Sequence, residues 1–199
     1  MRKKTMKRYK IVLLLWITIG VLLGVSSNIL AEEQEEEKRV IGFKFGVGYY
    51  ASLNDNRFEG ASSNFSLIIP IDAGLSAAVY HENGNINGKQ DGKTIDADID
   101  ISELRVSKDL VNSKSVSASL FLGAGNGEVE SIDFHDSSLV GDIGTELIFV
   151  KKIGKVTEAM LAVNMLYRYF HISPVTGVLT EEIDDLGGFV LGLNLSVLF

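Results

Sequence analysis

Residues 189–199 read FVLGLNLSVLF, and this stretch sets the pattern for the rest of the chain. Its odd-numbered positions are all large and apolar, while the positions between them include Gly192, Asn194 and Ser196. Successive side chains of a β-strand point to opposite faces, so strict alternation is typical of a strand whose two faces meet different surroundings. The stretch is therefore predicted to form a strand that ends at Phe199.

The same period of two recurs along most of the chain. It predicts eight strands, at residues 40–51, 62–69, 73–82, 95–107, 115–126, 138–151, 158–172 and 187–199. In the fourth, Ile99 and Ile101 fall out of phase with Leu104 and Val106, which predicts a β-bulge near Ser102. Short connections alternate with longer polar ones, which are expected at 52–61, 82–94, 127–137 and 173–186.

A membrane barrel explains this pattern better than a soluble, lipocalin-like barrel, which stays the alternative. The polar face carries small residues and single charges, such as Lys44, Asp142, Glu146 and Arg168, that fit inside a narrow eight-stranded lumen. Many segments approach the length of a tilted membrane crossing, and short turns alternate with long loops as in outer-membrane barrels. The predicted fold is all-β: an eight-stranded antiparallel transmembrane β-barrel with up-and-down strand order.

The first part of the chain is predicted to be an export signal. Residues 1–31 combine basic residues with an apolar run over 11–25 and contain no acid, which is typical of a secretory signal peptide cut after Ala31. An uncleaved anchor is the alternative, although a spanning helix needs about 20 apolar residues. The acidic stretch that follows predicts a disordered leader over 32–39, and the barrel then occupies 40–199 with both ends in the periplasm.

Composition excludes several kinds of function. A formal net charge of −7 argues against nucleic-acid binding, and the lack of cysteine excludes disulfides, cysteine zinc sites and thiol nucleophiles. Asp96, Asp98 and Asp100 alternate along one face of the fourth segment, which predicts an acidic row in the lumen or at the rim. The glutamate that completes an EF-hand calcium loop is missing. Neither a cofactor nor a metal site is predicted.

Histidine and serine at the end of the seventh segment form the candidate reactive site. His81 and His135 are expected to be solvated polar residues. His171 and Ser173 continue the odd-numbered apolar face of the seventh segment, so both are expected on the lipid-facing side at the external edge. Polar residues at that place either mark the end of the hydrocarbon band or carry chemistry.

The C-terminal third of the barrel resembles a known enzyme family. Residues 167–173 read YRYFHIS, a loop follows, and a final alternating strand ends at Phe199. This arrangement resembles the C-terminus of the lipid A deacylases of the PagL type, eight-stranded outer-membrane barrels with a YR-x-x-H-x-S pattern on the seventh strand. The resemblance implies an outer-membrane lipid A 3-O-deacylase-like esterase that hydrolyses an acyl ester of lipopolysaccharide.

The resemblance also assigns roles to residues. It implies that Ser173 is the nucleophile and His171 its general base. The carboxylate that orients the base best matches Asp185, with Glu182 and Glu181 as the other candidates. The family generally has glutamate where Asp185 stands.

Another departure from the family follows the serine. The family continues with Asn-Ala-Gly, whereas this chain has Pro174, and Gly177 offers a backbone N–H for the oxyanion only from a shifted position. Losing one oxyanion donor costs about 100- to 1000-fold in rate. The alternative function is therefore a non-enzymatic small barrel of the OmpX or OmpA-domain kind, with a structural or surface-binding role. Phe199 at the chain end resembles the C-terminal signal of outer-membrane proteins, which implies the barrel-assembly machinery as a partner.

Overall fold

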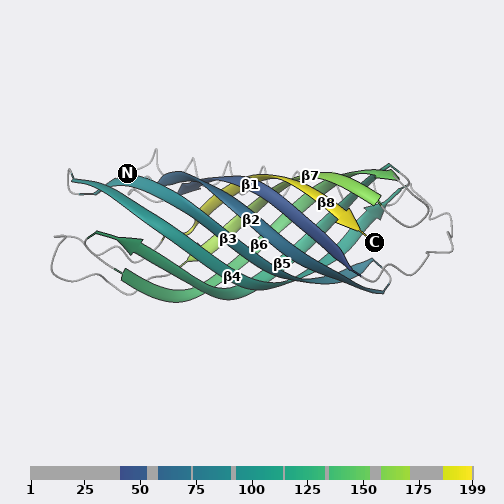
Figure 1. Cartoon of the computed structure of the whole chain (residues 1–199), viewed down its shortest axis with the longest axis horizontal. Coiled ribbons are helices and arrows are strands. Elements are labelled where there is room, and N and C mark those ends of the chain that lie inside the picture. The colour runs from purple at the N-terminus through teal and green to yellow at the C-terminus, as the bar shows by residue number, and fades with distance from the viewer. Residues whose placement is uncertain are drawn as a thin grey trace, which may run out of the picture.

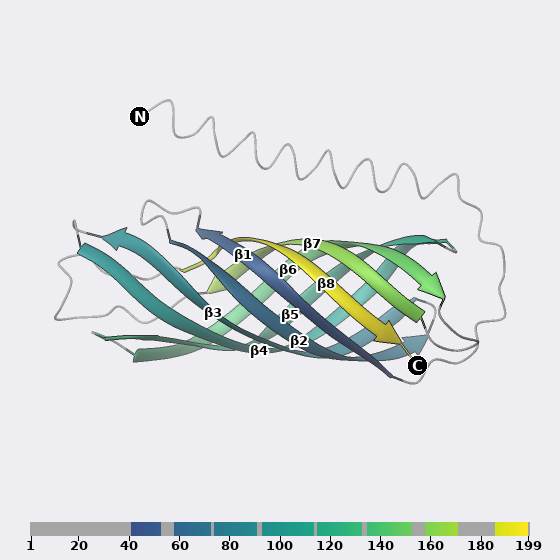
Figure 2. The ribbon, with the colours of Figure 1, turned by 45° about the horizontal axis from the view of Figure 1, so that its top comes forward.

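A computed structural model describes residues 41–52, 58–72, 74–90, 93–113, 115–132, 135–152, 158–170 and 186–198. They form one closed barrel of antiparallel strands in chain order, with β8 paired to β1, which confirms the predicted fold (Figure 1; Figure 2). The strands are β1 Gly42–Ser52, β2 Glu59–Asp72, β3 Leu75–Gln90, β4 Lys93–Asn112, β5 Val116–Ser131, β6 His135–Lys152, β7 Glu158–Phe170 and β8 Gly188–Leu198. The predicted signal peptide and acidic leader lie outside the described residues.

The strands are strongly staggered around the barrel. The pairing row that starts at Val116 of β5 passes through all the other strands and returns to β5 at Asn126. A stagger of this kind tilts the strands of a barrel by about 35–45° from its axis. No helix in the described part of the chain is long and apolar enough to cross a membrane.

Two hairpins are longer than the sequence pattern predicts. The expected loops over 82–94 and 127–137 are wrong, because both stretches are paired strand for most of their length. Their turn-type residues alternate across the sheet: the asparagines at 83, 85 and 87 are exposed on the outward face, while Ile86 points inward and is buried. The β3–β4 and β5–β6 hairpins therefore project beyond the other strands, at the left in Figure 1. We call this part, residues 83–90, 93–100, 128–131 and 135–137, the extension.

The predicted bulge near Ser102 is also wrong. Ser102 pairs with His81 of β3 and with Asn126 of β5, and the register continues unbroken on both sides. On β4 the register shifts between Asp109 and Val111, well away from Ser102. The change of hydrophobic phase that the sequence shows at Ser102 is real, but it has a different cause.

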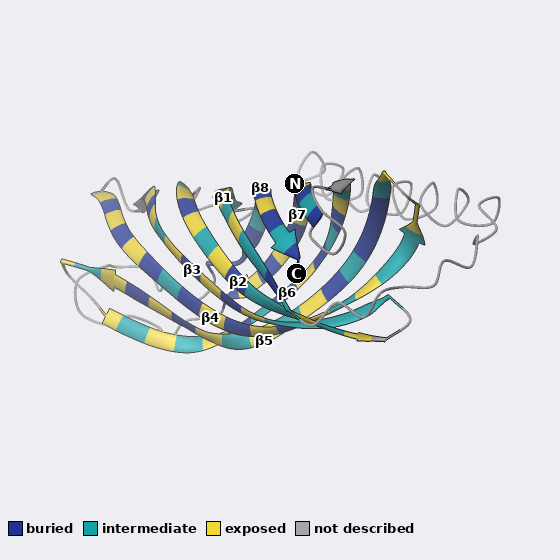
Figure 3. Ribbon diagram, turned by 45° about the vertical axis from the view of Figure 1, so that its right-hand side comes forward, coloured by how far each residue is buried: buried dark blue, intermediate teal, exposed yellow. Residues whose placement is uncertain are grey.

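That cause is a change of surroundings along the strand. Leu104 points outward with 69% of its surface exposed, whereas its neighbour Arg105 points into the lumen and is buried. Closer to the extension the two faces exchange character: Ile101 is fully buried inside, and the Asp100 carboxylate is outside. The first arrangement is that of a strand with lipid outside, and the second is that of a strand with water outside. Figure 3 shows the alternation of buried and exposed residues along the strands.

Exposed apolar side chains surround the barrel below the extension, and we call this set the belt. It comprises Phe45, Val47, Tyr49, Phe65, Ile69, Val79, Leu104, Val106, Leu122, Leu139, Ile143, Leu147, Phe149, Leu161, Val163, Met165, Tyr167, Tyr169, Leu191, Leu193 and Leu195. Soluble monomers rarely expose an apolar surface of this extent, so the belt is the lipid-contacting surface. Tyr167 and Tyr169 lie near the end of β7 on this surface, at the level where outer-membrane barrels carry aromatic residues.

Inside the belt, amide side chains pack directly on glycine backbone. A Cβ atom at Gly46 would overlap Asn194 Oδ1, and one at Gly192 would overlap Asn164 Oδ1. These glycines are required by space, whereas Gly74 in the β2–β3 turn is required by its φ of 70°. Each glycine thus makes room for the amide side chain of the residue paired with it on the neighbouring strand.

The assignment of the belt as the lipid-contacting surface can be tested by introducing an arginine at an outward position in the belt and at one on the extension. We expect Leu193→Arg, in the belt, to destabilise the barrel by about 2–4 kcal/mol, because the charge would enter hydrocarbon. Asn83→Arg also changes an exposed, outward residue, but on the extension, and should change stability by less than about 0.5 kcal/mol. Urea unfolding in lipid vesicles measures both, and equal effects would contradict the assignment of the belt.

Candidate functional site

The residues predicted for esterase chemistry lie outside the described part of the chain. These are His171, Ser173, Gly177, Glu181, Glu182 and Asp185. Their roles therefore stay predictions. The described part of β7 ends at Phe170, after Tyr167 and Tyr169 on the outward face.

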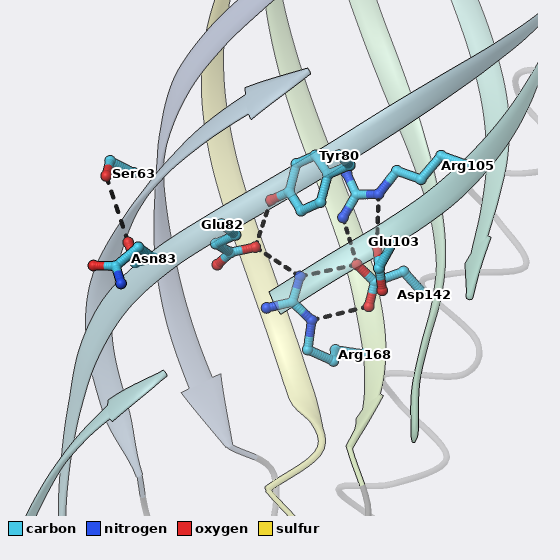
Figure 4. Close-up of polar contacts among 8 residues, drawn as sticks. All are labelled: Ser63, Tyr80, Glu82, Asn83, Glu103, Arg105, Asp142 and Arg168. Atoms are coloured by element: carbon cyan, nitrogen blue, oxygen red, sulfur yellow. Dashed lines mark hydrogen bonds and ion pairs between the residues drawn. The ribbon is translucent and has the colours of Figure 1, made fainter. Parts of the chain in front are cut away.

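The lumen holds a network of buried charges centred on Arg168 of β7 (Figure 4). Arg168 donates through Nε to Asp142 Oδ1 at 2.9 Å and through Nη2 to Asp142 Oδ2 at 2.9 Å. Its Nη2 also donates to Glu82 Oε2 at 2.7 Å. Asp142 lies on the adjacent β6, whereas Glu82 lies on β3, so one guanidinium connects opposite walls of the barrel.

Arg105 of β4 extends the network. It donates through Nη2 to Asp142 Oδ2 at 2.6 Å and through Nε to Glu103 Oε2 at 2.8 Å. Its guanidinium carbon lies 3.2 Å from the centre of the Tyr80 ring, a cation–π contact, and the Tyr80 hydroxyl donates to Glu82. The hydrogen-bonded side chains thus link β3, β4, β6 and β7.

A second polar layer lies deeper along the lumen. Lys44 of β1 donates to both carboxylate oxygens of Glu146 on β6, at 2.9 and 2.7 Å, and Asn194 of β8 donates to the same carboxylate at 3.5 Å. The sequence pattern placed Lys44, Asp142, Glu146 and Arg168 in the lumen as pairing residues, and the structure confirms that placement.

Apolar side chains fill the lumen above these layers, at the level of the extension. The buried cluster comprises Tyr50, Phe58, Ile86, Ile95, Ala97, Ile99, Ile101, Phe121, Val129, Val140, Leu166, Phe170, Leu186 and Val190. Most of them lie toward the extension, whereas Phe121 and Leu166 lie beside the charged network and are flanked along their strands by belt residues. The described lumen is therefore filled at two levels. Charged side chains fill it within the belt, and apolar side chains fill it toward the extension.

A histidine, a serine and an aspartate also meet on the outward surface at the edge of the belt. His81 Nδ1 lies 3.2 Å from Ser102 Oγ and 3.6 Å from Asp100 Oδ1. A Ser-His-acid triad needs the serine and the acid on different ring nitrogens. Here both neighbours share Nδ1, so the group does not have the geometry of a catalytic triad.

The predicted acidic row over 96–100 faces outward on the extension. Asn85 Nδ2 donates to Asp96 at 2.9 Å and to Asp98 at 3.3 Å. Glu128 and Glu130 of β5 pair beside the row, so the outward face of the extension is acidic. Among the described residues, no group of three or more acidic or histidine side chains could hold a metal ion.

Three members of the network, Glu82, Glu103 and Arg105, were not predicted from the sequence. Glu103 and Arg105 alternate with Leu104 and Val106, so their inward placement could have been found from the lower half of β4. Glu82 stands where the third predicted strand ended, and only the continuation of β3 to Gln90 brings it into the lumen.

Comparison with known proteins supports the fold. No family model and no curated protein sequence matches the chain. The crystal structure of neisserial surface protein A is 12% identical over 79% of this chain and 95% of its own, with a TM-score of 0.53. The chain has the fold of small outer-membrane barrels. The N-terminal barrel domain of Pseudomonas aeruginosa OprF is similar at 11% identity, over 80% of this chain and 96% of its own, with a TM-score of 0.45. At these sequence identities the structural similarity shows the fold alone. The resemblance to lipid A deacylases stays a prediction.

The network should stabilise the barrel strongly. We expect Arg168→Met to cost about 3–5 kcal/mol, because it leaves the buried carboxylates of Glu82 and Asp142 without their shared partner. Asp98→Asn, on the water-exposed extension, should cost less than about 0.5 kcal/mol. The temperature at which the folded, fast-migrating band disappears from a detergent gel measures both variants. An Arg168→Met barrel that melts with the wild type would contradict this role.

Proposed function

We propose that this protein is a non-enzymatic barrel of the bacterial outer membrane that acts through the surface of its extension. The observation that carries the proposal is the filled lumen: Arg168 is completely buried between opposite walls, and an apolar core lies beyond it. A barrel filled in this way offers no route for solutes. Of the described surface outside the belt, the outward face of the extension is the part available for interaction.

The orientation of the barrel in the membrane is inferred from the position of the chain ends and from the lengths of the connections between strands. The described ends of the chain meet at one end of the barrel, where Gly42 pairs with Leu198. In outer-membrane barrels the short turns face the periplasm and the long connections face outward. We therefore expect both described ends of the chain on the periplasmic side, with β8 accessible to the barrel-assembly machinery, and the acidic face of the extension outside the cell.

A second candidate function is hydrolysis of lipid A. It is favoured by the YRYFHIS stretch over 167–173 and by the outward, lipid-facing position of Tyr167 and Tyr169. In this alternative Ser173 attacks an acyl ester of lipopolysaccharide, His171 takes the serine proton, and Asp185 orients the histidine. No cofactor takes part in either function.

Genetic complementation separates the two functions. A strain that lacks the gene is supplied with wild type, with Ser173→Ala, or with a triple variant in which Asp96, Asp98 and Asp100 become asparagine. We expect Ser173→Ala to restore resistance to detergents and large antibiotics fully, and the triple variant to restore it poorly although it folds. Mass spectrometry of lipid A from the same strains should show one acylation pattern throughout.

The opposite result would favour the enzyme. If Ser173→Ala fails to complement and an acyl chain is retained on lipid A in that strain, the non-enzymatic proposal is wrong. Folding of each variant is checked by its heat-dependent mobility in detergent gels, so that failure to insert is not read as loss of function.

The filled lumen makes a separate prediction. Vesicles that contain the purified barrel should swell in small sugars no faster than vesicles without protein, because two packed layers block the lumen. Arg168→Met vesicles should stay equally tight, since the apolar core remains. Porin-like swelling of the wild type would contradict a filled lumen.

A further inference from the structure

The buried network contains more acids than bases. Glu82, Glu103 and Asp142 face each other inside the lumen together with only two guanidinium groups, those of Arg105 and Arg168. The side chains of all three acids are completely shielded from solvent. An uncompensated charge at such a place costs several kcal/mol, so the network needs one further positive charge.

The three acids differ in how well they are compensated. Asp142 accepts three charge-assisted hydrogen bonds, two from Arg168 and one from Arg105. Glu82 accepts from Arg168 and from the Tyr80 hydroxyl. Glu103 accepts only one bond, from Arg105 Nε to its Oε2, and its Oε1, like that of Glu82, has no hydrogen-bond partner among the described residues. Glu103 therefore gains least from being ionised.

Among the residues that the structure describes, no further cation lies near Glu103. Tyr80 and Glu82 face it from β3, Arg105 from β4, Asp142 from β6 and Arg168 from β7. On β5 the nearest position is Gly123, where an added Cβ would stand 2.9 Å from Glu103 Oε2. Every basic group near Glu103 is thus already shared with Asp142.

We propose that Glu103 is the protonated acid of this network, so that the lumen is neutral with the proton in place and acquires an unpaired buried charge when it is lost. The stability of the barrel then depends on pH through these buried charges at the edge of the belt. This inference concerns the lumen and does not depend on either proposed function.

The direction of the pH effect follows from the burial of Glu103. Glu103 follows Ser102 on β4 and points into the lumen at the level where the belt begins. Two guanidinium groups serve three carboxylates there, so an ionised Glu103 adds a buried negative charge beside Asp142 that neither arginine neutralises in full. The folded barrel thus keeps a proton that the unfolded chain loses, and its stability falls as the pH rises.

The test compares Glu103→Gln with two matched amide variants, Glu82→Gln and Asp142→Asn. Each replaces a carboxyl by an amide of the same shape, and the glutamine oxygen can still accept from Arg105 Nε. The readout is the melting midpoint of the folded band in detergent at mildly acidic and mildly alkaline pH. We expect wild type to lose stability at alkaline pH, and Glu103→Gln to keep its acidic-pH midpoint at both.

The control variants should behave differently. Glu82→Gln and Asp142→Asn each remove a charge that Arg168 needs, so their midpoints should lie below that of the wild type at mildly acidic pH. The proposal is overturned if Glu103→Gln melts as low as these two variants, or if it keeps the pH dependence of the wild type. It is also overturned if the carboxylic-acid C=O infrared band of the folded wild type persists in Glu103→Gln.

Discussion

Strands β3 to β6 pass from lipid to water while their hydrogen-bonded register continues unbroken across that boundary, and this constraint governs the rest of the structure. Inside a bilayer the backbone must pair fully, so the sheet has to close on itself and cannot slip a residue at the boundary. The side chains therefore have to change instead. On β4 the outward positions pass from Asp100 through Ser102 to Leu104, and the inward positions pass from Ile101 to Glu103 and Arg105.

The inside of the barrel follows from what lies outside it. Where water surrounds the extension, an apolar core formed by residues such as Ile86, Ile99 and Val129 holds the sheet together as in a soluble protein. Where lipid surrounds the belt, burial of apolar groups inside gives no comparable advantage, and hydrogen-bonded charges join the walls. Arg168 can be fully buried because Asp142 and Glu82 occupy two sides of its guanidinium. The glycines opposite Asn164 and Asn194 provide the space for this polar packing.

The sequence predicted the closed eight-stranded barrel and the inward Lys44 and Arg168, because period-two alternation survives in each strand. It failed at two kinds of place. Asparagine and glycine over 83–88 suggested a loop, yet in a water-exposed strand the same residues can alternate across a paired sheet. The phase change at Ser102 suggested a bulge, because a local pattern cannot separate a shifted register from a change of solvent. Pairing partners across the lumen, such as Glu82 and Arg168, depend on the stagger of the whole barrel and could not be predicted from either strand alone.

The inversion of the two faces along β4 is the central claim, and accessibility along that strand tests it most directly. The chain has no cysteine, so single cysteines can be introduced at 96, 98, 100, 104 and 106 without background labelling. After spin labelling in lipid vesicles, positions 96, 98 and 100 should be reached by a water-soluble paramagnetic reagent, and positions 104 and 106 by dissolved oxygen in the bilayer. Equal accessibility to both reagents at 100 and 104 would contradict a membrane boundary at Ser102.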